Sequence, residues 1–96
     1  MASAKNALRK VFEANMRAYA KNDADLEKRL SAYLKAEIKA AGITYAQLIE
    51  RLERHGYPDV TIDSLKKKLM RGQFSAGFFL ATLAALGVTQ IALKDV

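Results

Sequence analysis

Basic residues that share one side of a helix are the most chemically informative feature of the sequence. Lys66, Lys67 and Lys68 are consecutive, and Arg71 follows three positions later. Because a helix turns by about 100° per residue, Ser64, Lys67 and Arg71 fall on one side of it. Hydrogen-bond donors in such a row match the acceptors that base edges present in a DNA major groove. Lys66 and Lys68 flank this side, where phosphates would lie.

An apolar stripe lies on the other side of the same segment. Ile62, Leu65 and Leu69 fall within one arc of the helix and are predicted to be buried. Thr61 is the predicted N-cap of this helix, and Gly72 is its predicted end. The segment is therefore expected to hide its aliphatic side and to turn its cationic side outward.

The starts of two predicted helices are candidate DNA contacts. The first turn of a DNA-reading helix usually reaches deepest into the groove, which favours Thr61, Ser64 and Lys67 for contacts with bases. The preceding predicted helix starts at Thr44, where backbone N–H groups are available to a phosphate.

The net charge of +6 is unevenly distributed along the chain. Residues 1–20 and 61–96 each contain an excess of basic residues, whereas residues 21–60 are balanced. Such patches attract a polyanion. Consecutive lysines are also common where a helix simply faces water, so a solvated surface is the competing interpretation.

Residues typical of enzyme active sites and metal centres are sparse. His55 is the only histidine, and there is no cysteine. No metal-ligand spacing, phosphate-binding glycine loop or nucleophile motif is present. His55 lies at a predicted helix end, where the helix dipole favours a cationic side chain. We therefore expect no enzyme, no catalytic residue, no metal, no cofactor and no small-molecule substrate.

Five helices are predicted to position these residues. The chain is rich in helix formers and has one proline and five glycines. Polar caps and glycine stops place the helices over residues 3–20, from Asn22 or Asp23 to Gly42, from Thr44 to His55, from Thr61 to about Arg71 and from Ser75 to Gly87. The pattern leaves open whether residues 3–41 form two helices or one bent rod. Weak alternation at Ile91 and Leu93 predicts a short C-terminal strand.

Several short patterns between residues 42 and 88 occur together in a known family. Gly42-Ile43-Thr44 starts a predicted helix that contains Leu48 and Leu52, and Arg71-Gly72 ends the next helix. The segment closes on Ala85-Leu86-Gly87-Val88. It resembles the lambda-repressor-like (Xre/Cro) helix-turn-helix family. The resemblance implies an all-α, five-helix DNA-binding domain, here with an extra N-terminal helix.

A second set of patterns extends further toward the N-terminus. It consists of Leu34-Lys35-Ala36-Glu37-Ile38-Lys39, Thr44-Tyr45-Ala46 and the run from Lys67 and Lys68 to Ser75. In these patterns the chain is still more similar to an uncharacterised bacterial family of small domains, over about residues 30–88. The resemblance implies a helical extension at 1–29, a domain at 30–88 and a tail at 89–96.

The last predicted helix is apolar on nearly every side. From Phe78 to Leu86, Thr82 is the only polar residue. Such a helix is either central in its own core or shared with a partner, and a small chain buries it alone only with difficulty. We therefore hypothesise a homodimer whose interface contains Phe78, Phe79, Leu83, Ile91 and Leu93. The alternative is that residues 3–20 cover this helix within one chain.

Three functional hypotheses follow. The leading one is sequence-specific binding of double-stranded DNA by a small bacterial or phage transcriptional regulator, cytoplasmic and nucleoid-associated when bound. Its two copies would contact half-sites about one helical turn apart. The rival is a protein-interaction module, antitoxin-like or a phage adaptor, which the long turn at Gly56–Val60 favours. The third is membrane-surface binding by residues 3–20, because this predicted helix has a basic and an apolar face. No apolar run is long enough to span a membrane.

Overall fold

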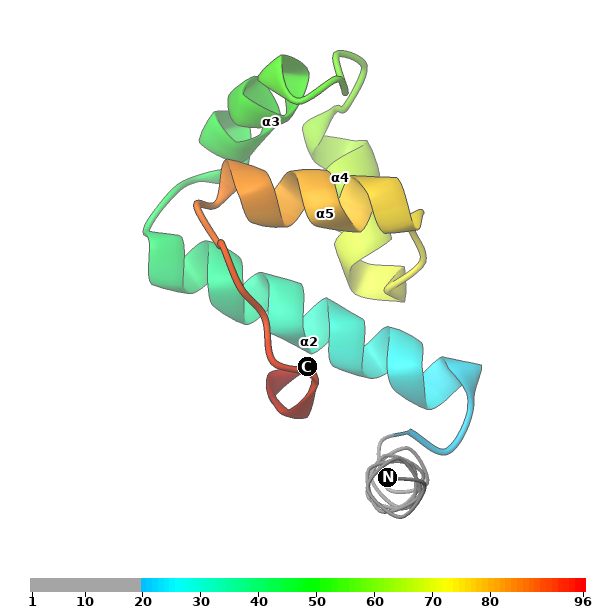
Figure 1. Ribbon diagram of the computed structural model, residues 1–96. Helices are drawn as coiled ribbons and strands as arrows, with labels where there is room; N and C mark the ends of the chain where they lie inside the picture. Colours follow the sequence, from blue (N-terminus) through cyan, green and yellow to red (C-terminus); the bar gives the residue numbers. More distant parts are fainter. Residues whose placement is uncertain (1–19) are drawn as a thin grey trace, which may run out of the picture.

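The computed structural model describes residues 20–96, which contain four α-helices, one short 3-10 helix and no strand (Figure 1). In chain order these are α2 (Asp23–Ala41), α3 (Tyr45–Arg54), α4 (Ile62–Arg71), α5 (Ala76–Ala85) and η1 (Leu93–Asp95). The all-helical class is confirmed, as are four of the five predicted helices. The remaining one, predicted over residues 3–20, lies outside the described residues apart from Ala20, which is not helical.

A polar side chain starts each described α-helix. The N-cap residues are Asn22, Thr44, Thr61 and Ser75. The Thr44 hydroxyl accepts from the Gln47 N–H at 3.1 Å, and the Gln47 side chain accepts from the Thr44 N–H at 2.8 Å. These bonds satisfy N–H groups that have no partner inside the helix. Because residues 20–22 are not helical, α2 begins as a helix of its own.

α2 is the longest described helix and packs against α4. α4 packs against α2 and α3, and α5 packs against α3 (Figure 1). Between the helices lies a core of buried apolar side chains: Leu34, Ile38, Leu48, Leu52, Leu65, Leu69, Phe78, Leu83 and Ala85. The domain boundary that the family resemblance implies between residues 29 and 30 falls inside α2, which is continuous across it.

One side of α5 packs into this core, which explains part of its apolar composition. Phe78 and Leu83 are 3% and 4% exposed, so the chain's own core covers nearly all of both side chains. The hydroxyl of the fully buried Thr82 donates to the Phe78 carbonyl oxygen at 2.8 Å and is thereby satisfied. The expectation that Phe78 and Leu83 lie at a dimer interface stays a prediction, although both side chains belong mainly to the chain's own core. Phe79 is partly buried and stacks on Phe74.

The expected burial of Ile62 is also corrected. Leu65 and Leu69 are 0% and 1% exposed, but Ile62 is 46% exposed. The reason is that α2 meets the C-terminal end of α4, where the buried Ser31 hydroxyl donates to the Leu69 carbonyl oxygen. Ile62 lies at the other end of α4 and remains on the surface.

The C-terminal residues return over α2 and form no strand. Residues 93–95 form η1, and the Val96 carbonyl oxygen accepts from Nε and Nη2 of Arg29 at 3.0 and 2.7 Å. Burial raises the pKa of the Tyr33 phenol, and the negative charges of Glu37 and Asp95 raise this pKa further. No strand exists in residues 20–96 for this segment to pair with, and the Arg29 side chain of α2 bonds to it instead.

Replacing Arg29 by alanine is expected to loosen the C-terminal residues. The change removes two charge-assisted donors from a partly buried carbonyl, a loss of about 1.5 kcal/mol of unfolding free energy. Hydrogen exchange at the Asp95 and Val96 amides should accelerate, because both bond within this segment. Lys28→Ala is the control, since it removes the same charge from an exposed neighbour on α2. Equal effects of the two changes would contradict this role of Arg29.

Candidate nucleic-acid interface

The orientation of α4 is set by its buried side and by its C-terminal end. Leu65 and Leu69 point into the core, and Gly72 ends the helix with φ +64°. Gly72 lies so close to α2 that a Cβ there would be 1.9 Å from the Glu27 carbonyl oxygen. Rotation of α4 about its axis would expose the leucines, so the outer side of the helix is defined.

The outer side of α4 carries the predicted basic row. Ser64, Lys67, Lys68, Arg71 and Gln73 line a shallow concavity of about 250 Å³. Lys66, Lys67 and Arg71 are exposed, as their spacing predicts. Gln73 was not among the predicted site residues, although its position directly after the glycine stop is a signal that could have indicated it. Its amide also donates to Glu27 Oε2 at 3.1 Å.

Lys67 is held only weakly on the outer side. Its Nζ lies 3.1 Å from Oδ2 of Asp63, one helical turn earlier, and both side chains are mostly exposed. Such exposed pairs contribute about 0.3–0.5 kcal/mol. The ammonium group can therefore leave Asp63 for a stronger acceptor at little cost.

Lys68 differs from its two lysine neighbours. It is half-buried, and its Nζ lies 5.4 Å from the centroid of the Phe78 ring. The Phe78 ring is in turn packed edge-on against Tyr57. A cation held over an aromatic face is attracted to it, so Lys68 is less available to an external anion than Lys66 or Lys67.

The Thr61 and Ser64 hydroxyl groups, which are predicted to contact bases, form hydrogen bonds that cap the start of α4. The Ser64 hydroxyl accepts from the Thr61 N–H and donates to the Thr61 carbonyl oxygen, both at 3.0 Å. The Thr61 hydroxyl accepts from the Ser64 N–H. Thr44 starts α3, beyond the end of α2 at Ala41, whereas α4 contacts α2 near Glu27. At 1.5 Å per residue, about 20 Å of α2 separates the end of α2 before Thr44 from its contact with the C-terminal end of α4.

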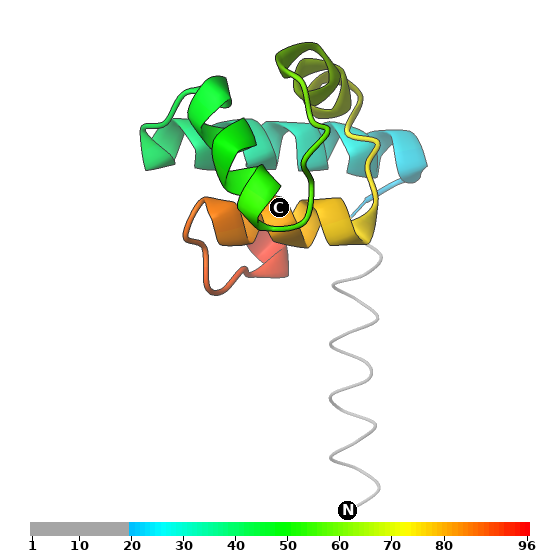
Figure 2. The ribbon, with the colours of Figure 1, turned by 90° about the horizontal axis from the view of Figure 1, so that it is seen from above.

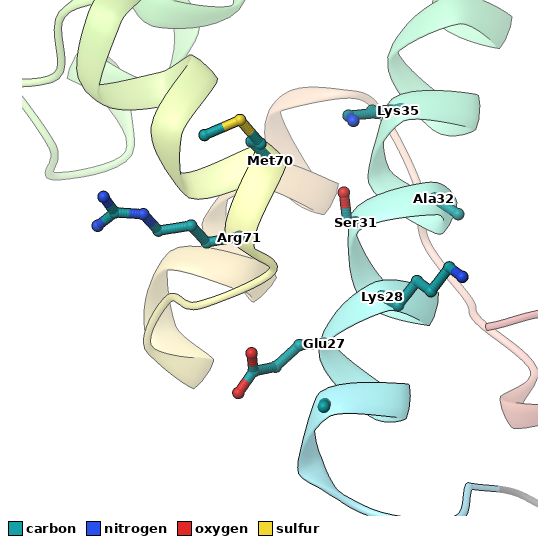
Figure 3. A pocket seen from close by; sticks show the side chains of 8 residues that line it. Glu27, Lys28, Ser31, Ala32, Lys35, Met70 and Arg71 are labelled. Atoms are coloured by element: carbon teal, nitrogen blue, oxygen red, sulfur yellow. The ribbon is translucent and has the colours of Figure 1, made fainter.

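A second, larger depression lies between α2 and α4 (Figure 3). It measures about 450 Å³ and is open to solvent. Met70 and Arg71 line it from α4, while Glu27, Ser31 and Lys35 project toward it from α2 (Figure 3). Met70 is 67% exposed. The depression thus combines an apolar residue with basic ones.

A model of one protein family matches residues 26–91, which is more than half of the chain. Its description is domain of unknown function (DUF6471). The chain belongs to the DUF6471 family. The DUF6471 match confirms the similarity to a small domain of unknown function, and it assigns no helix-turn-helix family. No curated protein and no solved structure matches the chain.

The DUF6471 match spans α3, α4 and α5 and most of α2. It therefore includes the outer side of α4 and both of its neighbours. Within residues 20–96, no helix has the length and apolarity needed to cross a membrane. In the same described range, no three His, Cys, Asp or Glu side chains are grouped so that they could hold a metal ion.

Proposed function

We propose that this DUF6471 protein binds double-stranded DNA through the outer side of α4 and acts as a transcriptional regulator. One observation carries the proposal: α4 buries Leu65 and Leu69 while Lys66, Lys67 and Arg71 remain exposed on its other sides. A major groove accepts a helix of this width, and its base edges offer acceptors to cationic donors.

The basic residues have different roles in this proposal. Lys67 and Arg71 lie on the outermost line of α4 and would contact base edges. Lys66 flanks that line and would contact a phosphate. Lys68, which is held over Phe78, would contribute less. Thr61 and Ser64 would act by holding the first turn of the helix in place.

The lambda-repressor-like arrangement is part of the proposal. α3 and α4 contact one another and are joined by residues 55–61, so they would form the helix pair of a helix-turn-helix motif. In that motif the second helix enters the major groove. The exposed side of α4 and its position after α3 support this assignment.

Selection from random duplex oligonucleotides tests the proposal. We expect the full chain to enrich a preferred duplex sequence, because exposed donors on a rigid helix can distinguish base edges. The affinity for that duplex should fall steeply with salt, with each phosphate contact adding about 0.9 to the slope of log K against log salt. A shuffled duplex of equal length is the control. Absence of duplex binding at low salt would refute the proposal.

The depression between α2 and α4 favours a second candidate function, binding of an acidic protein segment. Met70 would contact an apolar residue of that segment, and Lys35 and Arg71 would contact carboxylates. Met70→Ala should weaken such binding, because it removes the apolar contact, while leaving duplex binding largely unchanged, because it does not change the charge of α4. The two candidates are therefore separable by one variant.

A further inference from the structure

One long stretch of the chain contains no charge. Residues 72–93 include no Asp, Glu, Lys, Arg or His, although 27% of all residues are charged. This stretch forms α5 and the segment that follows it. The described part of the molecule therefore has one region whose surface carries no ionised side chain of its own.

Part of this region is apolar and exposed. Leu80 is 62% exposed and Ile91 39% exposed. With Ala84 and Val88 they line a groove of about 170 Å³ between α5 and the following segment. We call these four residues the uncharged face. α5 and this segment lie on the side of the molecule away from α4 (Figure 2).

We infer that the uncharged face binds a second copy of this chain in a two-fold symmetric dimer. In such a dimer both copies use the same surface, so residues near the axis meet their own counterparts. A charged residue there would meet a like charge, and two copies with a net charge of +6 repel one another elsewhere. An apolar face without charges avoids this repulsion and gains from burial.

The inference is independent of the proposed DNA binding, because it concerns a different side of the molecule. The exposed Leu80 is the expected anchor, since it stands beside a groove of the same face that its counterpart can enter. Because the contact is symmetric, one substitution changes both sides of the interface. A few residues near the centre of an interface contribute most of its affinity.

Light scattering of the full chain, combined with size exclusion at micromolar concentration, tests the dimer. We expect a mass of twice the 10.6 kDa chain. Leu80→Lys and Leu80→Glu should each raise the dimer dissociation constant by at least about tenfold, because each places two like charges together. Mixing the two variants should restore the dimer, since opposite charges then meet. Met70→Lys is the matched control, because Met70 is equally exposed but lies in the depression between α2 and α4.

Any of the following outcomes would overturn the inference of a dimer. A wild-type mass of one chain would mean that residues 1–19, another protein or solvent covers this face. A dimer that both Leu80 variants retain would place the contact elsewhere. Helical circular dichroism of the variants distinguishes a lost contact from a lost fold, and failure of the mixture to dimerise would argue against a two-fold contact at Leu80.

Discussion

Replacing Lys67 and Arg71 together by alanine is expected to weaken duplex binding by about 100-fold. Each side chain is exposed on the outer line of α4, and each base or phosphate contact of this kind contributes roughly 1–3 kcal/mol. A change of 1.4 kcal/mol is tenfold, so two contacts give about two orders of magnitude. Fluorescence anisotropy with the selected duplex measures the change. Stability should stay nearly constant, because neither side chain is buried.

A matched variant with the same charge loss separates a contact from a general electrostatic effect. Lys39 and Lys94 are both exposed and lie outside α4, so Lys39→Ala with Lys94→Ala also reduces the net charge by two. This control should weaken binding only slightly at moderate salt, because distant charges are screened. If both double variants lose the same affinity, α4 is not the contact surface.

Gly72→Ala is expected to destabilise the fold by about 3 kcal/mol or more. Alanine at φ +64° costs roughly 1–2 kcal/mol, and a Cβ 1.9 Å from the Glu27 carbonyl oxygen forces α4 and α2 apart. The contact is with backbone rather than with a flexible side chain, so it cannot relax by a rotamer change. For a domain of this size the melting temperature should fall by more than about 10 °C.

Gly42 provides the control for this prediction. It ends α2 with nearly the same φ, +68°, but a Cβ there would meet nothing within 4 Å. Gly42→Ala should therefore cost only the backbone term of roughly 1–2 kcal/mol. Chemical denaturation of both variants isolates the effect of the close approach. If the two glycine substitutions cost the same, the contact between Gly72 and α2 is not required.

Local interactions made much of the fold predictable from the sequence. The caps at Thr44 and Thr61 bond to residues three positions away, and the stops at Gly42 and Gly72 depend on the backbone freedom of glycine. The outward direction of Lys67 also followed from helical spacing, because its opposite side carries buried leucines. Such features involve residues within one or two helical turns.

Only the tertiary structure decided what each helix surface meets. Phe78 and Leu83 are core residues, and the Lys68 ammonium group lies over the Phe78 ring. Periodicity alone does not place these side chains relative to other helices. Arg29 and Val96 are 67 residues apart, and their contact replaces the strand expected at the C-terminus. Sequence periodicity defines the sides of each helix, but the contacts between helices depend on how separate segments pack together, and that packing determines which apolar sides are buried and which remain exposed.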